Sequence, residues 1–65
     1  MIEVNGTKIQ WLEGMTVRDV LKQMNYVWVH IIVSVNGQAI EQQDYNNYQI
    51  PDNAKVEVLN IFHGG

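Results

Sequence analysis

The sequence predicts a small α+β domain in which one mixed sheet of about five strands carries one helix packed on one face. Two Asn-Gly pairs, Asn5-Gly6 and Asn36-Gly37, follow short runs that are typical of strands. Residues 16–25 instead repeat apolar side chains at helical spacing. Runs rich in β-branched residues at 31–35 and 55–62 indicate strands in the middle and at the end of the sequence.

The first predicted element is a β-hairpin with strands at about 1–5 and 7–12. Apolar and polar residues alternate on both sides of Asn5-Gly6. Both central residues of a type I′ turn need a positive φ, which Asn and Gly adopt most readily. Trp11 continues the alternation, so we interpret it as a core residue rather than an interface anchor.

A short amphipathic helix follows the hairpin. Thr16 is suited to the N-cap, and Asp19 lies three residues later, as in a shortened capping box. Asn25 is suited to a left-handed conformation at the C-terminal end. The apolar face is formed by Val17, Val20, Leu21 and Met24. Because the helix is short, it must be stabilised by packing rather than by intrinsic propensity.

The strongly apolar segment 31–35 suits a central strand that is buried on both faces, or nearly so. Asn36-Gly37 then turns the chain into a short strand at 38–40. The polar stretch 41–49 is expected to be a loop, and a turn at 51–54 leads into the last strand. The expected anchors of the loop to the core are Tyr45, Tyr48 and Ile50.

A helix after an N-terminal hairpin can pack across the sheet, which allows the last strand to pair in parallel with the first. This arrangement agrees with the general preference for short connections and right-handed crossovers between parallel strands. We therefore predict one domain at 1–62 and a flexible tail at 63–65. The chain has 65 residues, a hydrophobic content of 46% and a net charge of −3, which indicate a globular domain rather than a disordered one.

Several classes of protein are disfavoured by composition. The four basic residues are scattered in an acidic chain, which argues against nucleic-acid binding. No apolar run is long enough to span a bilayer, and no secretion signal begins the sequence. The absence of cysteine excludes thiol catalysis and thiolate metal ligation, and it favours a cytoplasmic location.

The sequence ends in Gly64-Gly65, separated from the last predicted strand by His63 alone. Glycine has no side chain to pack and loses the most conformational freedom on ordering, so it anchors a terminus poorly. A carboxylate without flanking side chains can enter a narrow active site on another protein. The alternative is a frayed terminus in which the two glycines have no role.

This order of elements, together with the terminal glycines, resembles the ubiquitin-like β-grasp sulfur carriers, and most closely those of thiamine thiazole synthesis. The resemblance rests on Ile2-x-Val4-Asn5-Gly6, Glu13-Gly14-x-Thr16-Val17, Val33-x-Val35-Asn36-Gly37, Pro51-Asp52-x-x-Lys55-Val56-Glu57-Val58 and Gly64-Gly65. It covers essentially the whole chain. Phe62-His63 is bulkier than the small or aliphatic residues expected before the glycines.

The resemblance implies a protein co-substrate rather than an enzyme. Its Gly65 carboxylate would be adenylated and then converted into a thiocarboxylate that donates sulfur for thiazole synthesis. It further implies three partners: a ubiquitin-activating-like adenylyltransferase that uses ATP and magnesium, a sulfur donor such as a cysteine desulfurase, and thiazole synthase. No cofactor is expected on this chain. Rival hypotheses are a molybdopterin-type sulfur carrier, a ubiquitin-like modifier and an inert β-grasp binding module.

The last strand suggests a partner-binding surface beside the tail. If Val56 and Val58 face the core, Leu59 and Ile61 face outward by the strand period of two. Together with Phe62 and His63, they are the expected partner-binding residues. The alternative is a bulge that turns Leu59 and Ile61 inward and Asn60 outward.

No enzyme site or metal site is predicted. The two histidines, His30 and His63, have no cysteine or spaced carboxylate to complete a metal site. Trp28 is the better surface candidate of the two tryptophans, and Met15 and Met24 are interpreted as gap-filling core residues. Two acidic loop residues, Glu41 and Asp44, are interpreted as solvated rather than as contacts for a basic partner.

Overall fold

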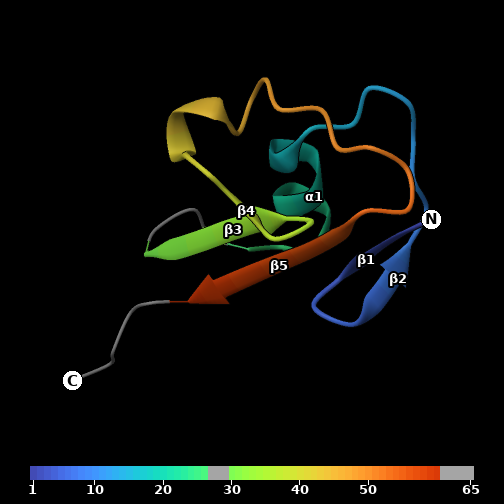
Figure 1. The fold of residues 1–65 in the computed structure, drawn as a ribbon, viewed down its shortest axis with the longest axis horizontal. Helices are drawn as coiled ribbons and strands as arrows, with labels where there is room; N and C mark the ends of the chain where they lie inside the picture. The colour runs from blue at the N-terminus through green and yellow to red at the C-terminus, as the bar shows by residue number, and fades with distance from the viewer. Residues whose placement is uncertain (27–29, 61–65) are drawn as a thin grey trace.

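The computed structural model describes residues 1–26 and 30–60 (Figure 1). Its elements in chain order are β1 (Ile2–Val4), β2 (Thr7–Ile9), α1 (Val17–Gln23), β3 (Ile31–Val35), β4 (Gln38–Ile40), a 3₁₀-helix (Gln42–Asp44) and β5 (Lys55–Asn60). The sheet has the order β2-β1-β5-β3-β4, and β1 pairs with β5 in parallel while the other pairs are antiparallel. The predicted α+β architecture, including the parallel pairing of the first and last strands, is confirmed.

Both predicted Asn-Gly turns are present and have nearly the same backbone. Asn5 and Gly6 have φ values of 49° and 86°, and Asn36 and Gly37 have values of 51° and 85°. The strand β2 ends earlier than expected, at Ile9 rather than at about residue 12. Ile9 already pairs with Ile2, the first residue of β1, so residues further along have almost no strand left to pair with.

Helix α1 begins and ends with the predicted caps. The Thr16 hydroxyl accepts from the Asp19 amide, and the Asp19 carboxylate accepts from the Thr16 amide, which completes the capping box. Asn25 follows the helix with φ 60°. The amide of Asn25 donates to the Lys22 carbonyl and that of Tyr26 to the Leu21 carbonyl, which is the Schellman pattern.

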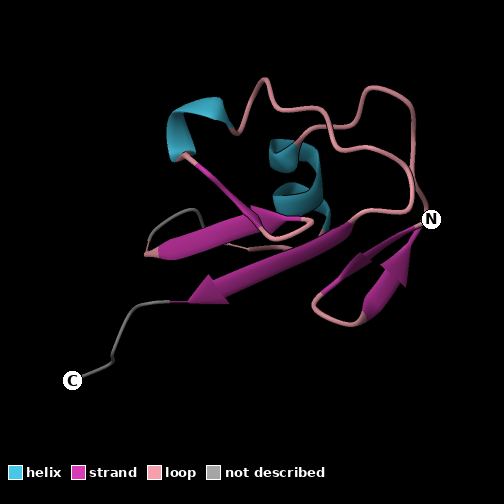
Figure 2. Ribbon diagram, viewed as in Figure 1, coloured by secondary structure: helices cyan, strands magenta, loops and turns pink. Residues whose placement is uncertain are grey.

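The core lies between α1 and one face of the sheet, as the layers in Figure 2 show. The helix contributes Val17, Val20 and Leu21, all fully buried. Segment 31–35 forms β3, an internal strand between β5 and β4, as predicted. The prediction that it is buried on both faces, or nearly so, is wrong, because the described residues cover only this face and in β3 only Val33 and Val35 are buried.

The segment after β4 wraps the beginning of the helix. Tyr45 and Ile50 are buried and Tyr48 is partly buried against the core, which confirms the predicted anchors. The carbonyls of Tyr48 and Tyr45 accept from the amides of Val17 and Arg18, which lie in the first turn, where helix amides have no partner inside the helix. The sequence did not reveal the short 3₁₀-helix in this segment.

Candidate functional site

The candidate site is the end of β5 and the face of the sheet beside it. Five of the predicted site residues, Ile61, Phe62, His63, Gly64 and Gly65, lie outside the described residues. Leu59 is described and lies one residue before the end of β5. The described site therefore consists of Leu59 and the surface around it.

Leu59 faces outward, as the strand period predicts. Its exposed fraction is 59%, whereas Val56 and Val58 are 1% and 7% exposed beneath the helix. The pairing of β5 with β3 is continuous from Val56 to Asn60, so no bulge reverses the strand within this range. Leu59 thus presents an aliphatic side chain to solvent just before the predicted tail.

Ile32 completes this surface and was not predicted. It lies directly opposite Leu59 in the register of β3 with β5 and is 43% exposed. Side chains opposite each other on one face of an antiparallel pair are close enough to form one surface. We refer to the two residues as the Ile32–Leu59 pair. The strand period of two places Ile32 on the face opposite to Val33 and Val35, but the apolar run 31–35 is predicted from the sequence to be buried on both faces.

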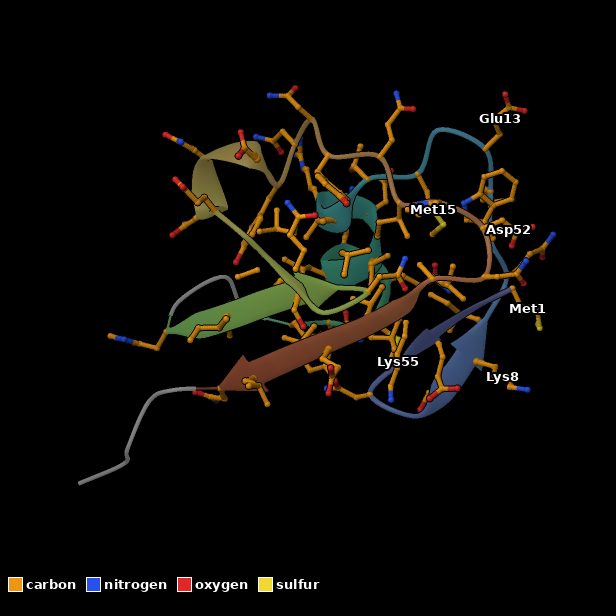
Figure 3. All side chains as sticks on the ribbon, viewed as in Figure 1. Met1, Lys8, Glu13, Met15, Asp52 and Lys55 are labelled. Atoms are coloured by element: carbon orange, nitrogen blue, oxygen red, sulfur yellow. The ribbon has the colours of Figure 1, made fainter. Side chains whose placement is uncertain are left out.

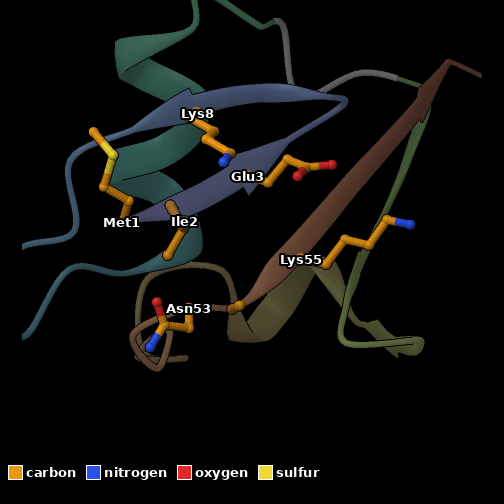
Figure 4. Close-up of a pocket in the computed structure, with 7 residues that line it drawn as sticks. Met1, Ile2, Glu3, Lys8, Asn53 and Lys55 are labelled. Carbon is orange, nitrogen blue, oxygen red and sulfur yellow. The ribbon is translucent and has the colours of Figure 1, made fainter.

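The opposite end of the same face is charged. Glu3 of β1 lies between Lys8 of β2 and Lys55 of β5 in the strand register. These side chains line a hollow of about 260 Å³ together with Met1 and Asn53 (Figure 4). Lys8 and Lys55 lie on the side of the sheet away from Met15 and the helix (Figure 3). The open face therefore changes from charged at the start of β5 to aliphatic at its end.

The other residues weighed from the sequence are core residues or exposed loop residues where they are described. Trp11 is half-buried against the core, and its indole N–H donates to the Ile50 carbonyl at 2.7 Å. Met15 is buried and Met24 partly buried. Glu41 accepts from the Gln43 side chain at 3.0 Å, and Asp44 is exposed. Trp28 lies outside the described residues.

Titratable groups of the described part of the chain do not converge on a reactive centre. Burial raises the pKa of the Tyr45 phenol, an effect partly offset by a hydrogen bond with the Val33 backbone, and this side chain belongs to the core. Among residues 1–26 and 30–60, no group of three or more His, Cys, Asp or Glu side chains is arranged to hold a metal ion. His30 is exposed, with φ 58°.

A comparison with models of protein families shows the family to which the chain belongs. The model of the ThiS family matches residues 1–65. The chain belongs to the ThiS family. Members of this family are small sulfur carriers of thiamine biosynthesis and are not enzymes, and they act together with activating and sulfur-transfer proteins. Membership thus selects one of the functional classes that the sequence left open.

Two solved structures share the fold. The crystal structure of the thiamine biosynthesis protein ThiS from Geobacter metallireducens has a TM-score of 0.78 at 24% identity, over 98% of this chain and 97% of that one. A solution NMR structure of a thiamine biosynthesis protein from the same organism has a TM-score of 0.75 at 24% identity, over 98% and 86%. The predicted ubiquitin-like β-grasp arrangement is thereby confirmed.

No helix in the described residues of this ThiS-family chain has the length and apolar character needed to cross a membrane.

Proposed function

We propose that this ThiS-family protein carries sulfur as a thiocarboxylate on Gly65 and donates it for synthesis of the thiamine thiazole. The observation that supports this most is the family match, which extends over residues 1–65 and so includes Gly64-Gly65. In this proposal residues 1–62 form the folded domain, and 63–65 form a flexible tail that enters the active sites of partner proteins.

The chemistry begins with activation of a poor electrophile. A carboxylate oxygen of Gly65 attacks the α-phosphorus of ATP, with release of pyrophosphate and formation of an acyl-adenylate. The terminal sulfur of a persulfide then attacks the acyl carbon and displaces AMP to give an acyl disulfide. A second thiol attacks the sulfur that came from the parent thiol of the persulfide; this releases the thiocarboxylate and leaves the two thiols joined in a disulfide. A ubiquitin-activating-like adenylyltransferase supplies the ATP and magnesium site, and a cysteine desulfurase is the proposed source of the persulfide sulfur.

The residue types at the tail suit this role. Gly65 has no side chain to obstruct attack at its carbonyl carbon, and Gly64 adopts backbone conformations that other residues avoid. The chain contains no cysteine, so the thiocarboxylate is its only strong sulfur nucleophile. The same lack of cysteine, typical of proteins outside oxidising compartments, supports a cytoplasmic location for the reaction.

We further propose that the Ile32–Leu59 pair contacts the activating enzyme. In this proposal Ile61, Phe62 and His63 also contact that enzyme, as the tail enters its active site. Grouped aliphatic side chains in solvent are typical of interaction sites, whereas single ones are common on any surface. The pair lies beside the end of β5, where a contact would hold the following residues close to the partner. Thiazole synthase is the proposed acceptor of the sulfur.

Intact-protein mass spectrometry tests the proposal. The protein is produced alongside the biosynthetic enzymes of its host and compared with a variant that lacks Gly65. We expect the mass to rise by the exchange of one oxygen for sulfur, and we expect no rise in the variant. An unchanged mass in the presence of a competent activating enzyme and sulfur donor would contradict the proposal, and covalent adducts with other proteins would indicate a modifier instead.

A further inference from the structure

The side chain of Asn5 does more than form a turn. Its Oδ1 accepts from the amide of Val58 at 2.8 Å, and its Nδ2 donates to the Val58 carbonyl at 3.0 Å. The two residues are 53 positions apart in the sequence. The primary amide of Asn5 therefore pairs with both backbone groups of one residue of β5, as a neighbouring strand would.

This contact lies where β1 has already ended. The Asn5 backbone amide donates to the Val56 carbonyl at 3.0 Å, which continues the parallel pairing of β1 with β5. The chain then turns away from β5 at Gly6, and the Asn5 side chain forms the next hydrogen bonds with β5, at Val58. Residues at the end of β5 thus stay held on the β1 side as well as on the β3 side, and the next residue is Leu59.

Tyr26 orients this amide. The second Nδ2 hydrogen bond of Asn5 goes to the Tyr26 hydroxyl at 3.0 Å, and Tyr26 is partly buried against the core. The Tyr26 backbone closes the Schellman pattern at the end of α1. With three hydrogen bonds, the Asn5 amide has little freedom to rotate, so the end of the helix and the end of β5 are connected through one side chain.

We propose that Asn5, oriented by Tyr26, is a positioning residue that holds the end of β5 and presents Leu59 to the activating enzyme. This inference rests on the function proposed above, because it assumes that the Ile32–Leu59 pair is the contact surface. Asn5 and Tyr26 take no part in the chemistry at Gly65. Their expected effect is therefore on productive binding of the carrier rather than on the rate of its adenylation once bound.

The chain supplies a matched control in the second Asn-Gly turn. Asn36 has a φ within 2° of that of Asn5, and its Oδ1 also accepts from an amide of β5, that of Lys55 at 2.9 Å. Lys55 lies at the charged start of the strand, far along it from Leu59. Asn5→Gly and Asn36→Gly each remove one side chain, and both leave a Gly-Gly pair that suits the same turn.

Amide hydrogen exchange tests the contact itself. In Asn5→Gly we expect the Val58 amide to exchange at least about tenfold faster, with the Lys55 amide unchanged. In Asn36→Gly we expect the reverse pattern. Unchanged exchange at Val58 in Asn5→Gly would overturn the positioning role, whatever the state of the proposed function.

Adenylation kinetics test its consequence. Carrier-dependent ATP–pyrophosphate exchange, catalysed by a purified ubiquitin-activating-like adenylyltransferase with Mg²⁺, is measured against carrier concentration at a temperature at which all variants are folded. For Asn5→Gly we expect KM to rise roughly fivefold to tenfold at unchanged kcat, for Tyr26→Phe a smaller rise, and for Asn36→Gly less than about twofold.

The outcomes separate the two proposals. Equal KM values for Asn5→Gly and Asn36→Gly, with the wild-type chain active, would overturn the positioning role and leave the proposed function intact. A fall in kcat at constant KM would also overturn it, because a positioning residue away from Gly65 does not stabilise the transition state. A wild-type chain that the enzyme does not adenylate would overturn the proposed function and, with it, the role of Asn5 in it.

Discussion

Consecutive residues of β5 meet opposite environments on the two faces of the sheet. Val58 is 7% exposed beneath α1, whereas Leu59 is 59% exposed on the other face. On the closed face, aliphatic side chains pack against Val17, Val20 and Leu21 of the helix. On the open face, the described residue opposite Leu59 in the strand pair is the aliphatic Ile32.

The difference separates stability from recognition. Removing apolar surface from water is the main favourable term in folding, so the closed face accounts for much of the stability of the domain. Leu59 and Ile32 remain 59% and 43% exposed, so they contribute less of this term than the fully buried side chains do. The proposal made above is that a partner covers these two side chains.

The largest effect on stability is expected from Leu21→Ala on the closed face. Leu21 is fully buried, and truncating such a side chain removes its transfer free energy and leaves a cavity, for a loss of about 2–5 kcal/mol in the free energy of unfolding. This is a large fraction of the stability of a small domain. Urea denaturation followed by circular dichroism measures the loss.

Leu59→Ala is the matched variant on the open face. Leu59 is mostly exposed, so the same truncation there is expected to change the free energy of unfolding by less than about 0.5 kcal/mol. Similar losses for the two variants would mean that Leu59 is buried in solution, and the distinction between the two faces would then fail.

A second prediction concerns binding, for which the open face is expected to matter more than the closed face. Leu59→Asp and Ile32→Asp each place a charge in the proposed contact, where covering it by a partner is unfavourable. We expect the folded state to persist and the affinity for the activating adenylyltransferase to fall by at least about tenfold. Isothermal titration calorimetry measures the affinity, and circular dichroism verifies the fold.

Glu57→Asp controls for the poor fit of aspartate to a strand, because Glu57 is the preceding outward position of β5. Its affinity is expected to stay within about twofold of the wild-type value. Unfolding of Leu59→Asp would indicate a core role for Leu59. Undiminished affinity in a folded Leu59→Asp variant would remove the Ile32–Leu59 pair from the interface.

Features encoded by neighbouring residues were predicted well from the sequence. Asn5-Gly6 and Asn36-Gly37 specify their turns through the φ values that these residues tolerate. Thr16 and Asp19 specify the start of the helix through reciprocal hydrogen bonds over three residues. The outward direction of Leu59 followed from the strand period alone.

Two features that depend on distant parts of the chain were missed, although the parallel pairing of the first and last strands was predicted correctly. A continuous apolar run such as 31–35 does not reveal which face is covered, since this depends on how many layers surround the sheet. Among the described residues, α1 covers one face of the sheet, and Ile32 lies on the other face, where it is 43% exposed. Likewise, nothing local in Asn5-Gly6 indicates that the Asn5 side chain pairs with Val58, because that contact exists only after β1 and β5 are side by side.

The smallest effect is expected just before β1 and β5, where Met1 contacts the turn that contains Asp52. The N-terminal ammonium of Met1 donates to Asp52 at 2.9 Å, so that the chain before β1 is paired with the turn before β5. Hydrogen bonding to this ammonium is the main cause that lowers the pKa of the exposed Asp52 carboxyl. Exposed ion pairs contribute little to stability, since solvent screens them.

The sign of the pH dependence follows from the lowered pKa. An aspartate that is more acidic in the folded state stabilises the protein above its unfolded pKa of about 3.9, and this contribution is lost as the pH falls through the lower folded value. We therefore expect Asp52→Asn to melt at a slightly lower temperature than wild type at pH 7, by much less than Leu21→Ala. The difference should vanish in strong acid, where both side chains are neutral. Differential scanning calorimetry from pH 7 to pH 2 checks this, and a difference that grows on acidification would show that the pair does not stabilise the fold.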